Sequence, residues 1–398
     1  MPNQFNLSLS LPQPSEAEQA HSRACHEYIE KIIEEAGGKI PFSQFMELAL
    51  YTPDLGYYTS AKEKFGREGD FVTGPELTPL FGQCIAQQCQ QVIQTLRRQC
   101  DNNTPIDLLE LGAGSGKLAE QVLTLLDELH FLPDHYYILE PSKHLQTQQR
   151  AYLKKQCPHL ATRVVWLNRL PKKALTGMII ANEVLDALPI ERFTIQKQQV
   201  QQYFVSIDNG ELVFQFEPAS EALLTTLNSG YLCPPYETDN YHSEINLMLA
   251  DWLKNLSNSL AKGVMLFVDY GYTNNEYYHP DRKDGTLACY YQHHQHSNPL
   301  ILTGIQDISA HVNFTLLAKC AISANLQVDG FCNQASFLLS SGLPQFLEKS
   351  PSAQTQQAVR KLTLPGEMGE ACKVIALSKH YEDDPLLGFL LNDLRCKL

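Results

Sequence analysis

The segment Glu110-Leu-Gly-Ala-Gly-Ser-Gly116 follows a short apolar run and precedes residues with helical spacing, which predicts a tight turn between a strand and a helix. A glycine-rich turn of this kind lets the backbone approach a bound ligand closely. The dinucleotide pattern G-x-G-x-x-G needs a glycine where this chain has Lys117, and the P-loop pattern needs a glycine and a hydroxyl where it has Leu111 and Leu118. What remains is an acidic residue, Glu110, before three alternating glycines, Gly112, Gly114 and Gly116.

Strands and helices alternate around this turn, which favours an α/β fold with a mostly parallel sheet. The predicted strands are short and apolar, as strands covered on both faces should be, and span residues 106–110, 136–140, 163–167, 177–181 and 264–269. Further strands are expected at residues 326–328 and 372–377, and helices at residues 25–36, after Pro41, and at 79–98, 334–339 and 354–362. Residues 193–207 and 211–218 instead alternate like antiparallel strands, which indicates an insertion.

Composition narrows the class of protein. The 398 residues carry a net charge of −13, which argues against a nucleic-acid partner and favours a basic substrate. Eleven cysteines without a C-x-x-C pair indicate reduced thiols. The first residues lack the basic start and apolar run of a secretory signal, and no stretch approaches the roughly 20 apolar residues of a membrane span. We therefore expect a cytoplasmic protein.

Polar residues follow three of the predicted strands at the edge where open α/β sheets bind ligands. Glu140 ends the second strand, where a carboxylate can accept hydrogen bonds from ribose hydroxyls; an ordinary solvated strand end is the alternative. The fourth strand leads into residues 182–189, with Asn182, Glu183 and Asp186, which are either site residues or a helix cap. After the fifth strand come Asp269 and Tyr270, where the tyrosine either contacts substrate or packs between helices.

Seven segments in this order resemble the MidA-type methyltransferases, a family that includes a mitochondrial complex I assembly factor that methylates a protein arginine. They are GDFVTGPE (69–76), ELGAGSG (110–116), NEVLDALP (182–189), VDYGY (268–272), GTLACYYQHH (285–294), DISAHVNF (307–314) and MGEACKV (368–374). The chain departs from the family pattern at Ala113 and Ser115, where Pro or Arg is frequent, and at Asn313, where Asp is more usual.

The resemblance implies a class I, Rossmann-like fold with a seven-stranded sheet, an N-terminal helical extension and an inserted substrate region. It also implies S-adenosyl-L-methionine as cofactor and a protein arginine, in a complex I-type subunit, as methyl acceptor. Carried onto this sequence, it assigns cofactor contacts to Phe71, Thr73, Glu110, Gly112, Gly114, Gly116, Glu140 and Asn182.

The expected organisation has four parts. Residues 1–78 form the helical extension and a loop that covers the cofactor, and residues 79–189 form the first part of the cofactor-binding core. Residues 190–255 form the insertion, and residues 256–398 complete the core, with substrate loops at residues 271–314.

For an arginine acceptor, we expect Glu183, assisted by Asp186 or Asp269, to orient the guanidinium and to accept the released proton, since carboxylates bind this planar group bidentately. Tyr270 and His311 are candidate substrate contacts, although a hydrogen-bonded core histidine is the alternative for His311. No metal site is expected, because the neighbouring histidines 293, 294 and 296 lack further ligands at suitable spacing. Two matters stay open: a cofactor-binding assembly factor that acts without catalysis, and a homodimer.

Overall fold

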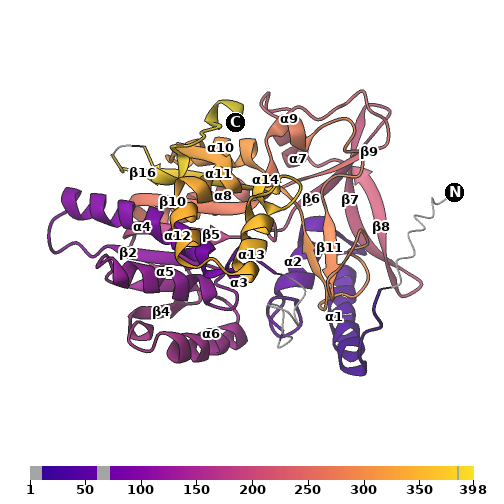
Figure 1. Cartoon of the computed structure of the whole chain (residues 1–398). Coiled ribbons are helices and arrows are strands. Elements are labelled where there is room, and N and C mark those ends of the chain that lie inside the picture. The colour runs from indigo at the N-terminus through magenta and orange to yellow at the C-terminus, as the bar shows by residue number, and fades with distance from the viewer. Residues whose placement is uncertain (1–10, 61–71, 383–384) are drawn as a thin grey trace.

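The computed structural model describes residues 11–60, 72–382 and 385–398 (Figure 1). Its largest sheet has the strand order β15-β16-β10-β5-β2-β3-β4. The five strands from β10 to β4 are parallel, and β16 runs antiparallel to both of its neighbours. The strands are β2 (Asp107–Leu111), β3 (Tyr136–Leu139), β4 (Val164–Leu167), β5 (Leu175–Asn182), β10 (Leu260–Tyr272), β15 (Gln327–Asn333) and β16 (Cys372–Lys379).

The predicted α/β class is confirmed, but the number of strands differs from the prediction. The sheet has eight strands rather than seven, because the two-residue strand β14 (Val312–Asn313) pairs in parallel with the end of β10. Its partners Gly271 and Tyr272 lie beyond residue 269, where the apolar run of β10 was expected to end. So short a strand has no detectable period of its own, and only its long-range pairing defines it.

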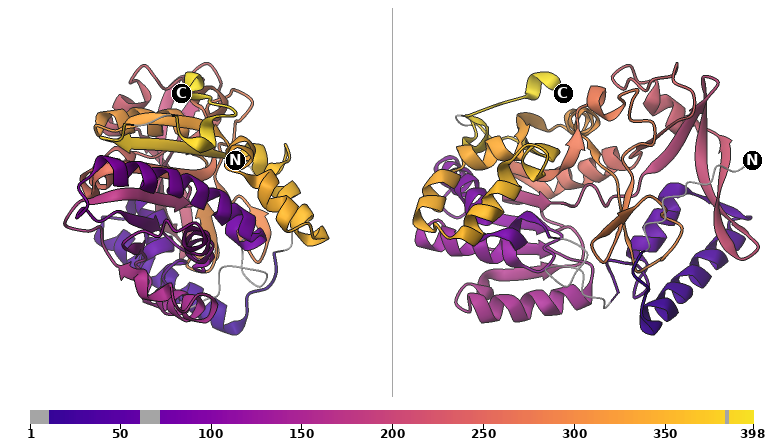
Figure 2. Two further views of the ribbon diagram at one scale, coloured as in Figure 1. Left: turned by 60° about the vertical axis from the view of Figure 1, so that its left-hand side comes forward. Right: turned by 45° about the vertical axis from the view of Figure 1, so that its right-hand side comes forward.

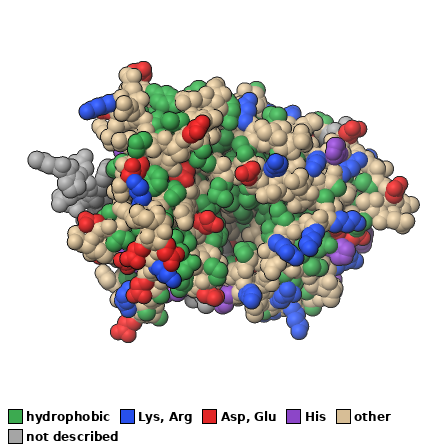
Figure 3. Space-filling model, turned by 180° about the vertical axis from the view of Figure 1, so that it is seen from behind, with side chains coloured by type: hydrophobic (Ala, Val, Ile, Leu, Met, Phe, Trp, Pro, Cys, Tyr) green, Lys and Arg blue, Asp and Glu red, His purple; other side chains and the backbone are tan. Residues whose placement is uncertain are grey.

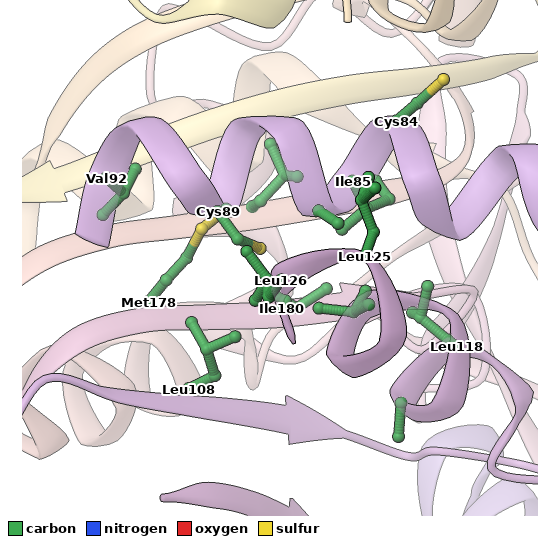
Figure 4. Packing of buried hydrophobic residues seen from close by; sticks show 14 of the residues in the cluster. Cys84, Ile85, Cys89, Val92, Leu108, Leu118, Leu125, Leu126, Met178 and Ile180 are labelled. Atoms are coloured by element: carbon green, nitrogen blue, oxygen red, sulfur yellow. The ribbon is translucent and has the colours of Figure 1, made fainter. Parts of the chain in front are cut away.

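Helices cover both faces of this sheet, since alternate residues of each buried strand point to opposite sides. One face packs against α4 (Pro79–Gln99), α5 (Lys117–Glu128), α6 (Lys143–Gln156), α11 (Gln334–Ser340), α12 (Leu343–Lys349) and α13 (Ala353–Thr363). Figure 4 shows this core, in which α4 and α5 place Cys89 and Leu126 above Leu108 of β2 and Ile180 of β5. The other face packs against α8 (Leu249–Ser259) and α10 (Phe314–Ser323).

A second sheet, antiparallel and of five strands, has the order β1-β7-β6-β9, with β8 paired to β7. It lies beside the main sheet and packs against α1 and α2 (Figures 1 and 2). A three-stranded sheet, β12-β11-β13, joins the same core through Cys289 and Ile308. The elements are α1 (Glu16–Glu35), β1 (Lys39–Pro41), α2 (Phe42–Tyr51), β6 (Glu191–Gln196), β7 (Gln199–Asp208), β8 (Glu211–Pro218), β9 (Tyr241–Ile245), β11 (Ala288–Tyr291), β12 (His294–His296) and β13 (Asp307–Ser309).

The remaining elements are short, and one long helix starts earlier than predicted. Helix α1 begins at Glu16 rather than near Cys25, because Ser15 and Glu18 form a reciprocal capping box. The short helices are α3 (Gly74–Leu77), α7 (Glu221–Leu227), α9 (Asn274–Tyr277), α14 (Met368–Ala371), η1 (Ala161–Arg163), η2 (Leu387–Phe389) and η3 (Arg395–Lys397).

The helices and the surface charges of the protein show how it meets its surroundings. None of the helices in the described ranges combines the length and apolar character needed to cross a bilayer. Seen from behind, the molecule has a central hollow rich in apolar side chains, with acidic side chains mainly to its left and basic ones mainly to its right (Figure 3). The net negative charge is therefore unevenly distributed.

Gly177 on β5 lies in close contact with the backbone of β2. A Cβ at this position would lie 1.8 Å from the carbonyl oxygen of Asp107, so Gly177→Ala has to push β5 away from β2. We expect a loss of about 3 kcal/mol in the free energy of unfolding, measured by urea denaturation. Gly210→Ala is the matched control, because Gly210 has a φ of +81° and nothing within 4 Å of the added Cβ. It should cost only about 1–2 kcal/mol; equal losses would contradict the packing argument.

Candidate active site

The glycine turn between β2 and α5 has the conformation that its sequence predicts. Gly112 has a φ of +62° and its added Cβ would lie 3.2 Å from Val184 Cγ2. Gly116, with a φ of +85°, is the N-cap of α5. At both positions the backbone has a positive φ, which residues other than glycine rarely adopt. The N–H groups at the start of α5 thereby stay available beside the turn.

A cavity of about 330 Å³ lies beside this turn, at the carboxyl ends of β2, β3 and β5. Such a volume is within the range of about 300–1,000 Å³ that small-molecule sites occupy. Six carboxyl side chains line it, while the described part of its wall contains no Lys, Arg or His. They are Glu76, Glu110, Glu140, Glu183, Asp186 and Asp307. A cavity with this charge favours a cationic ligand.

Glu110 and Glu140 enter the cavity from neighbouring strands. Glu110 is 2% exposed on β2 and accepts a hydrogen bond from the Tyr136 hydroxyl at 2.8 Å. Burial raises the pKa of Glu110 to about 7. Glu140 directly follows β3, and its carboxylate accepts hydrogen bonds from Ser142 N at 2.9 Å and from Gln149 Nε2 at 3.3 Å. The two carboxylates thus have fixed orientations beside the glycine turn.

Gln149 on α6 ties these parts of the site together, although nothing in the sequence singled it out. Its Nε2 also donates to the Gly114 carbonyl at 2.9 Å, and its Oε1 accepts from Trp166 Nε1 at 2.9 Å. Gln149 is fully buried. One side chain therefore connects Glu140 to the glycine turn, a contact that only the packing of α6 creates.

The segment after β5 is a turn and not a helix, so the helix-cap interpretation of Asn182 is wrong. Glu183 has a φ of +53°, a conformation that non-glycine residues rarely adopt. Asp269 holds this turn: its Oδ2 accepts hydrogen bonds from the backbone N–H groups of Val184, Leu185 and Asp186 at 3.1, 2.8 and 3.3 Å. Its Oδ1 accepts from Tyr270 N at 2.8 Å.

The turn directs Asn182, Glu183 and Asp186 to the cavity wall. Burial and the nearby Asp269 raise the pKa of Glu183 to about 7. Burial, Asp269 and Asp307 raise the pKa of Asp186 well above its usual value. Asn182 Nδ2 donates to Glu183 Oε1 at 3.2 Å, whereas the buried Asn182 Oδ1 has no hydrogen-bond partner among the described residues. That acceptor and the carboxylates suit a ligand that carries N–H or O–H donors.

The N-terminal part of the chain contributes Thr73 and Glu76, while Phe71 lies outside the described residues. Glu76 on α3 accepts hydrogen bonds from the side chains of Ser115 and Lys117 in and after the glycine turn. The prediction overlooked Glu76, although it closes the segment GDFVTGPE. These two contacts connect α3 to the glycine turn.

Comparison with known proteins identifies the class of this cavity. A family model described as "Putative S-adenosyl-L-methionine-dependent methyltransferase" matches residues 84–332, more than half of the chain. The chain belongs to this family. It is therefore an S-adenosylmethionine-dependent methyltransferase, and the expected cofactor and family resemblance are confirmed.

Full-length relatives agree with this assignment. A crystal structure from Burkholderia thailandensis bound to S-adenosyl-homocysteine is 37% identical, with a TM-score of 0.90 over 98% of this chain and 100% of that one. "Protein arginine methyltransferase NDUFAF7 homolog, mitochondrial" of Drosophila melanogaster is 28% identical over 94% of this chain and 90% of its own length. The human protein arginine methyltransferase NDUFAF7 is 26% identical over 86% and 81%.

The comparisons also correct one expectation. The predicted cytoplasmic location is contradicted by the curated relatives, whose names place them in mitochondria. Composition and the absence of a secretory pattern carry no information that separates these compartments. A homodimer finds no support in the comparisons.

Tyr270 and His311 lie outside the methyltransferase cavity. Their rings stack at a centroid distance of 6.0 Å. Burial and the charges of Arg282 and Lys373 lower the pKa of His311 to about 4, so the imidazole is neutral. The ring contacts of Tyr270 fit the packing alternative. The hydrogen-bonded alternative for His311 is not met at its buried Nδ1, which has no hydrogen-bond partner among the described residues. Substrate contact by either residue stays a prediction.

Asp269 also lies behind the cavity wall and not in it, since backbone N–H groups surround its carboxylate. Asp269→Asn should lower the free energy of unfolding by about 2 kcal/mol in urea denaturation. The amide of Asn has one accepting oxygen instead of two and carries no charge, so it cannot accept all the backbone hydrogen bonds that the carboxylate accepts. Asp281→Asn is the control, since the Asp281 side chain is 91% exposed. It should change stability by less than about 0.5 kcal/mol. If Asp269→Asn were as harmless as the control, the carboxylate would not hold the turn.

Proposed function

We propose that this methyltransferase transfers a methyl group to an arginine side chain of a partner protein. The observation that carries the proposal is the cavity wall, which combines six carboxyl side chains with no basic residue among those described. An arginine guanidinium is always cationic and binds carboxylates in a bidentate manner. The names of the fly and human relatives support the same acceptor. Following the family resemblance, we expect the partner to be a subunit of respiratory complex I type.

S-adenosylmethionine would supply an electrophilic methyl group on a positively charged sulfur. Gly112, Gly114 and Gly116 would hold it through their backbone, and Glu140 would accept hydrogen bonds from its ribose hydroxyls. Glu110 and Asn182 provide acceptors for the cationic end of the cofactor. Thr73, near the start of α3, would help to cover it. The apolar side chains of Leu139, Leu145 and Leu170 in the same wall suit a nucleoside base.

Glu183 and Asp186 would orient the guanidinium so that one nitrogen faces the methyl group. Transfer would break the bond between the methyl carbon and sulfur and leave S-adenosyl-homocysteine as the neutral thioether. The nitrogen that gains the methyl group would lose a proton, which Glu183 would accept. A pKa near 7 suits this task, because about half of the Glu183 side chains are then ionised at neutral pH and the carboxylate is a stronger base than an ordinary one. Asp269 acts as a positioning residue, since it fixes the backbone that carries both acids.

Glu183→Gln should abolish methyl transfer and change the Kd for S-adenosyl-homocysteine by no more than about twofold. In the unaltered protein, kcat/KM should rise as pH increases through about 7, because Glu183 must be ionised, and level off above it. Transfer of a labelled methyl group measures turnover, and calorimetry measures the Kd for S-adenosyl-homocysteine. Undiminished turnover of Glu183→Gln would rule out the catalytic role.

The acceptor itself can be identified with labelled cofactor and a lysate of the source organism, followed by mass spectrometry of the labelled protein. Labelled arginine is the expected product. A blank result from protein that binds the cofactor would favour an assembly factor that acts without catalysis.

We further propose that residues 1–78 form a helical extension and a loop that covers the cofactor, and that residues 190–255 form the substrate insertion. Residues 79–189 and 256–398 would form the cofactor-binding core, with substrate loops at residues 271–314. The cluster of α1, α2 and β7 supports a separate N-terminal part, because it is distinct from the clusters on the two faces of the main sheet. Strands β6 and β9 of the insertion instead pack with one of those faces.

A further inference from the structure

Gln149 occupies a position on α6 that packing alone would give to an apolar residue. The buried side chains of this helix, Leu145, Gln149 and Leu153, follow one another at intervals of four residues and so share one face. Gln149 is fully buried, and a buried amide costs free energy unless it is hydrogen-bonded. An apolar side chain would fill the same space without that cost, so the hydrogen bonds of Gln149 are what distinguish it.

The orientation of the Gln149 amide follows from its three partners. The indole N–H of Trp166 can only donate, so the amide oxygen faces it, at 2.9 Å. The amide nitrogen then faces two groups that accept, the Gly114 carbonyl at 2.9 Å and Glu140 Oε2 at 3.3 Å. Its two hydrogens match these two acceptors. One side chain thus joins β4, the glycine turn and the acid that follows β3.

Ser142 and Gln149 hold the two oxygens of the Glu140 carboxylate. Ser142 N donates to Oε1 at 2.9 Å, and Gln149 Nε2 donates to Oε2. The last side-chain torsion of a glutamate is otherwise loosely defined, and two hydrogen bonds on different oxygens fix the plane of the carboxylate. A group that is ordered before the ligand arrives spares the ligand the entropy cost of ordering it.

Gln149 lies behind the cavity wall and not in it. The wall includes Gly114 and Glu140, and neither Gln149 nor Trp166 belongs to it. The Arg150 guanidinium lies over the Trp166 ring, 3.9 Å from the ring centroid, and holds the indole that orients the amide. Any effect of Gln149 on a ligand therefore passes through the two wall residues that it contacts.

We infer that Gln149, oriented by Trp166, positions the Glu140 carboxylate and thereby sets how strongly the protein prefers a ribose to a dideoxyribose ligand. The inference rests on the proposed function, in which Glu140 accepts hydrogen bonds from the ribose hydroxyls of the cofactor. A site built around hydroxyl groups rejects a ligand that lacks them, because its buried polar groups then lose partners. That rejection is strong only while the carboxylate keeps its orientation. Gln149 is a positioning residue for cofactor specificity.

The test compares S-adenosyl-homocysteine with its 2′,3′-dideoxy form, in which hydrogen atoms replace both ribose hydroxyls. Calorimetry on the full chain gives the Kd of each ligand, and the ratio of the two Kd values is the ribose preference. The dideoxy form keeps the rest of the ligand, so its Kd reports whether a variant is folded with an intact cavity. A merely structural role of Gln149 would change both Kd values by the same factor and leave the ratio unchanged.

The unaltered protein should bind S-adenosyl-homocysteine at least about 30-fold more tightly than the dideoxy form. Glu140→Gln should remove most of this preference. Gln149→Met, which keeps an unbranched side chain of similar length without the donors, should lower the preference about 5- to 20-fold. Trp166→Phe, which removes the indole N–H and keeps an aromatic ring, should lower it about 2- to 5-fold. Gln149→Met and Trp166→Phe should keep the Kd for the dideoxy form within about threefold.

Gln146→Met is the matched control. Gln146 also lies on α6, but its Nε2 donates to the backbone carbonyl of Glu140, at 2.7 Å, and not to the carboxylate. The ribose preference of this control should therefore stay within about twofold of the unaltered value. When Glu140→Gln and Gln149→Met are combined, the second substitution should change the preference by less than about twofold, because Gln149 acts through the Glu140 carboxylate.

The outcomes separate this inference from the proposed function. If the unaltered protein shows no ribose preference, or Glu140→Gln keeps it, the proposed ribose contact of Glu140 is wrong and the inference falls with it. If Glu140→Gln loses the preference while Gln149→Met keeps it, or weakens both ligands equally, the proposed function stands and the positioning role of Gln149 is wrong. If Gln149→Met does not fold, Trp166→Phe decides, and an unchanged ratio in that variant would overturn the inference.

Discussion

The carboxylate of Asp269 accepts four backbone hydrogen bonds from the turn after β5 and from its own neighbour on β10. Each strand alone would leave these N–H groups without partners, and burying them unpaired would cost free energy. Because β5 and β10 are adjacent and parallel, one side chain at the end of β10 can organise the chain beyond β5. The left-handed backbone of Glu183 and the direction of Asp186 depend on that network.

The same network shapes the electrostatics of the cavity. Asp269 is buried beside Glu183 and Asp186, and it contributes to the raised pKa of both. Ionising carboxyls with raised pKa values opposes folding, so this cost grows as pH rises from the usual carboxyl range through about 7. A bound cation offsets it, because an opposite charge favours the ionised form. The cationic cofactor therefore gains affinity from carboxylates whose ionisation costs free energy in the folded protein.

Three hydrophobic clusters contribute residues to this cavity, one from each face of the main sheet and one from α1, α2 and the second sheet. The main sheet brings Glu110, Glu140 and the turn after β5, while the core of α1, α2 and the second sheet brings Tyr51 and Tyr58. Glu76 on α3 bonds to Ser115 and Lys117 and so joins the N-terminal part of the chain to the glycine turn. The arrangement of the cavity walls is thus a property of packing between segments that are far apart in the sequence.

The sequence by itself determined the α/β class, the main parallel strands to within a few residues, the glycine turn and the polar strand ends of the site. These follow from local patterns: apolar runs, alternation, and glycines where the backbone needs a positive φ. The tertiary structure alone decided that Asp269 supports the wall and that Tyr270 and His311 lie outside the cavity. It also decided that Tyr51, Tyr58 and Asp307 line the cavity and that Gln149 connects Glu140 to the glycine turn. The eighth strand, β14, is likewise defined only by its pairing with β10. Those outcomes depend on contacts between distant residues, and the direction of a side chain into or behind a wall has no periodic signal in the sequence.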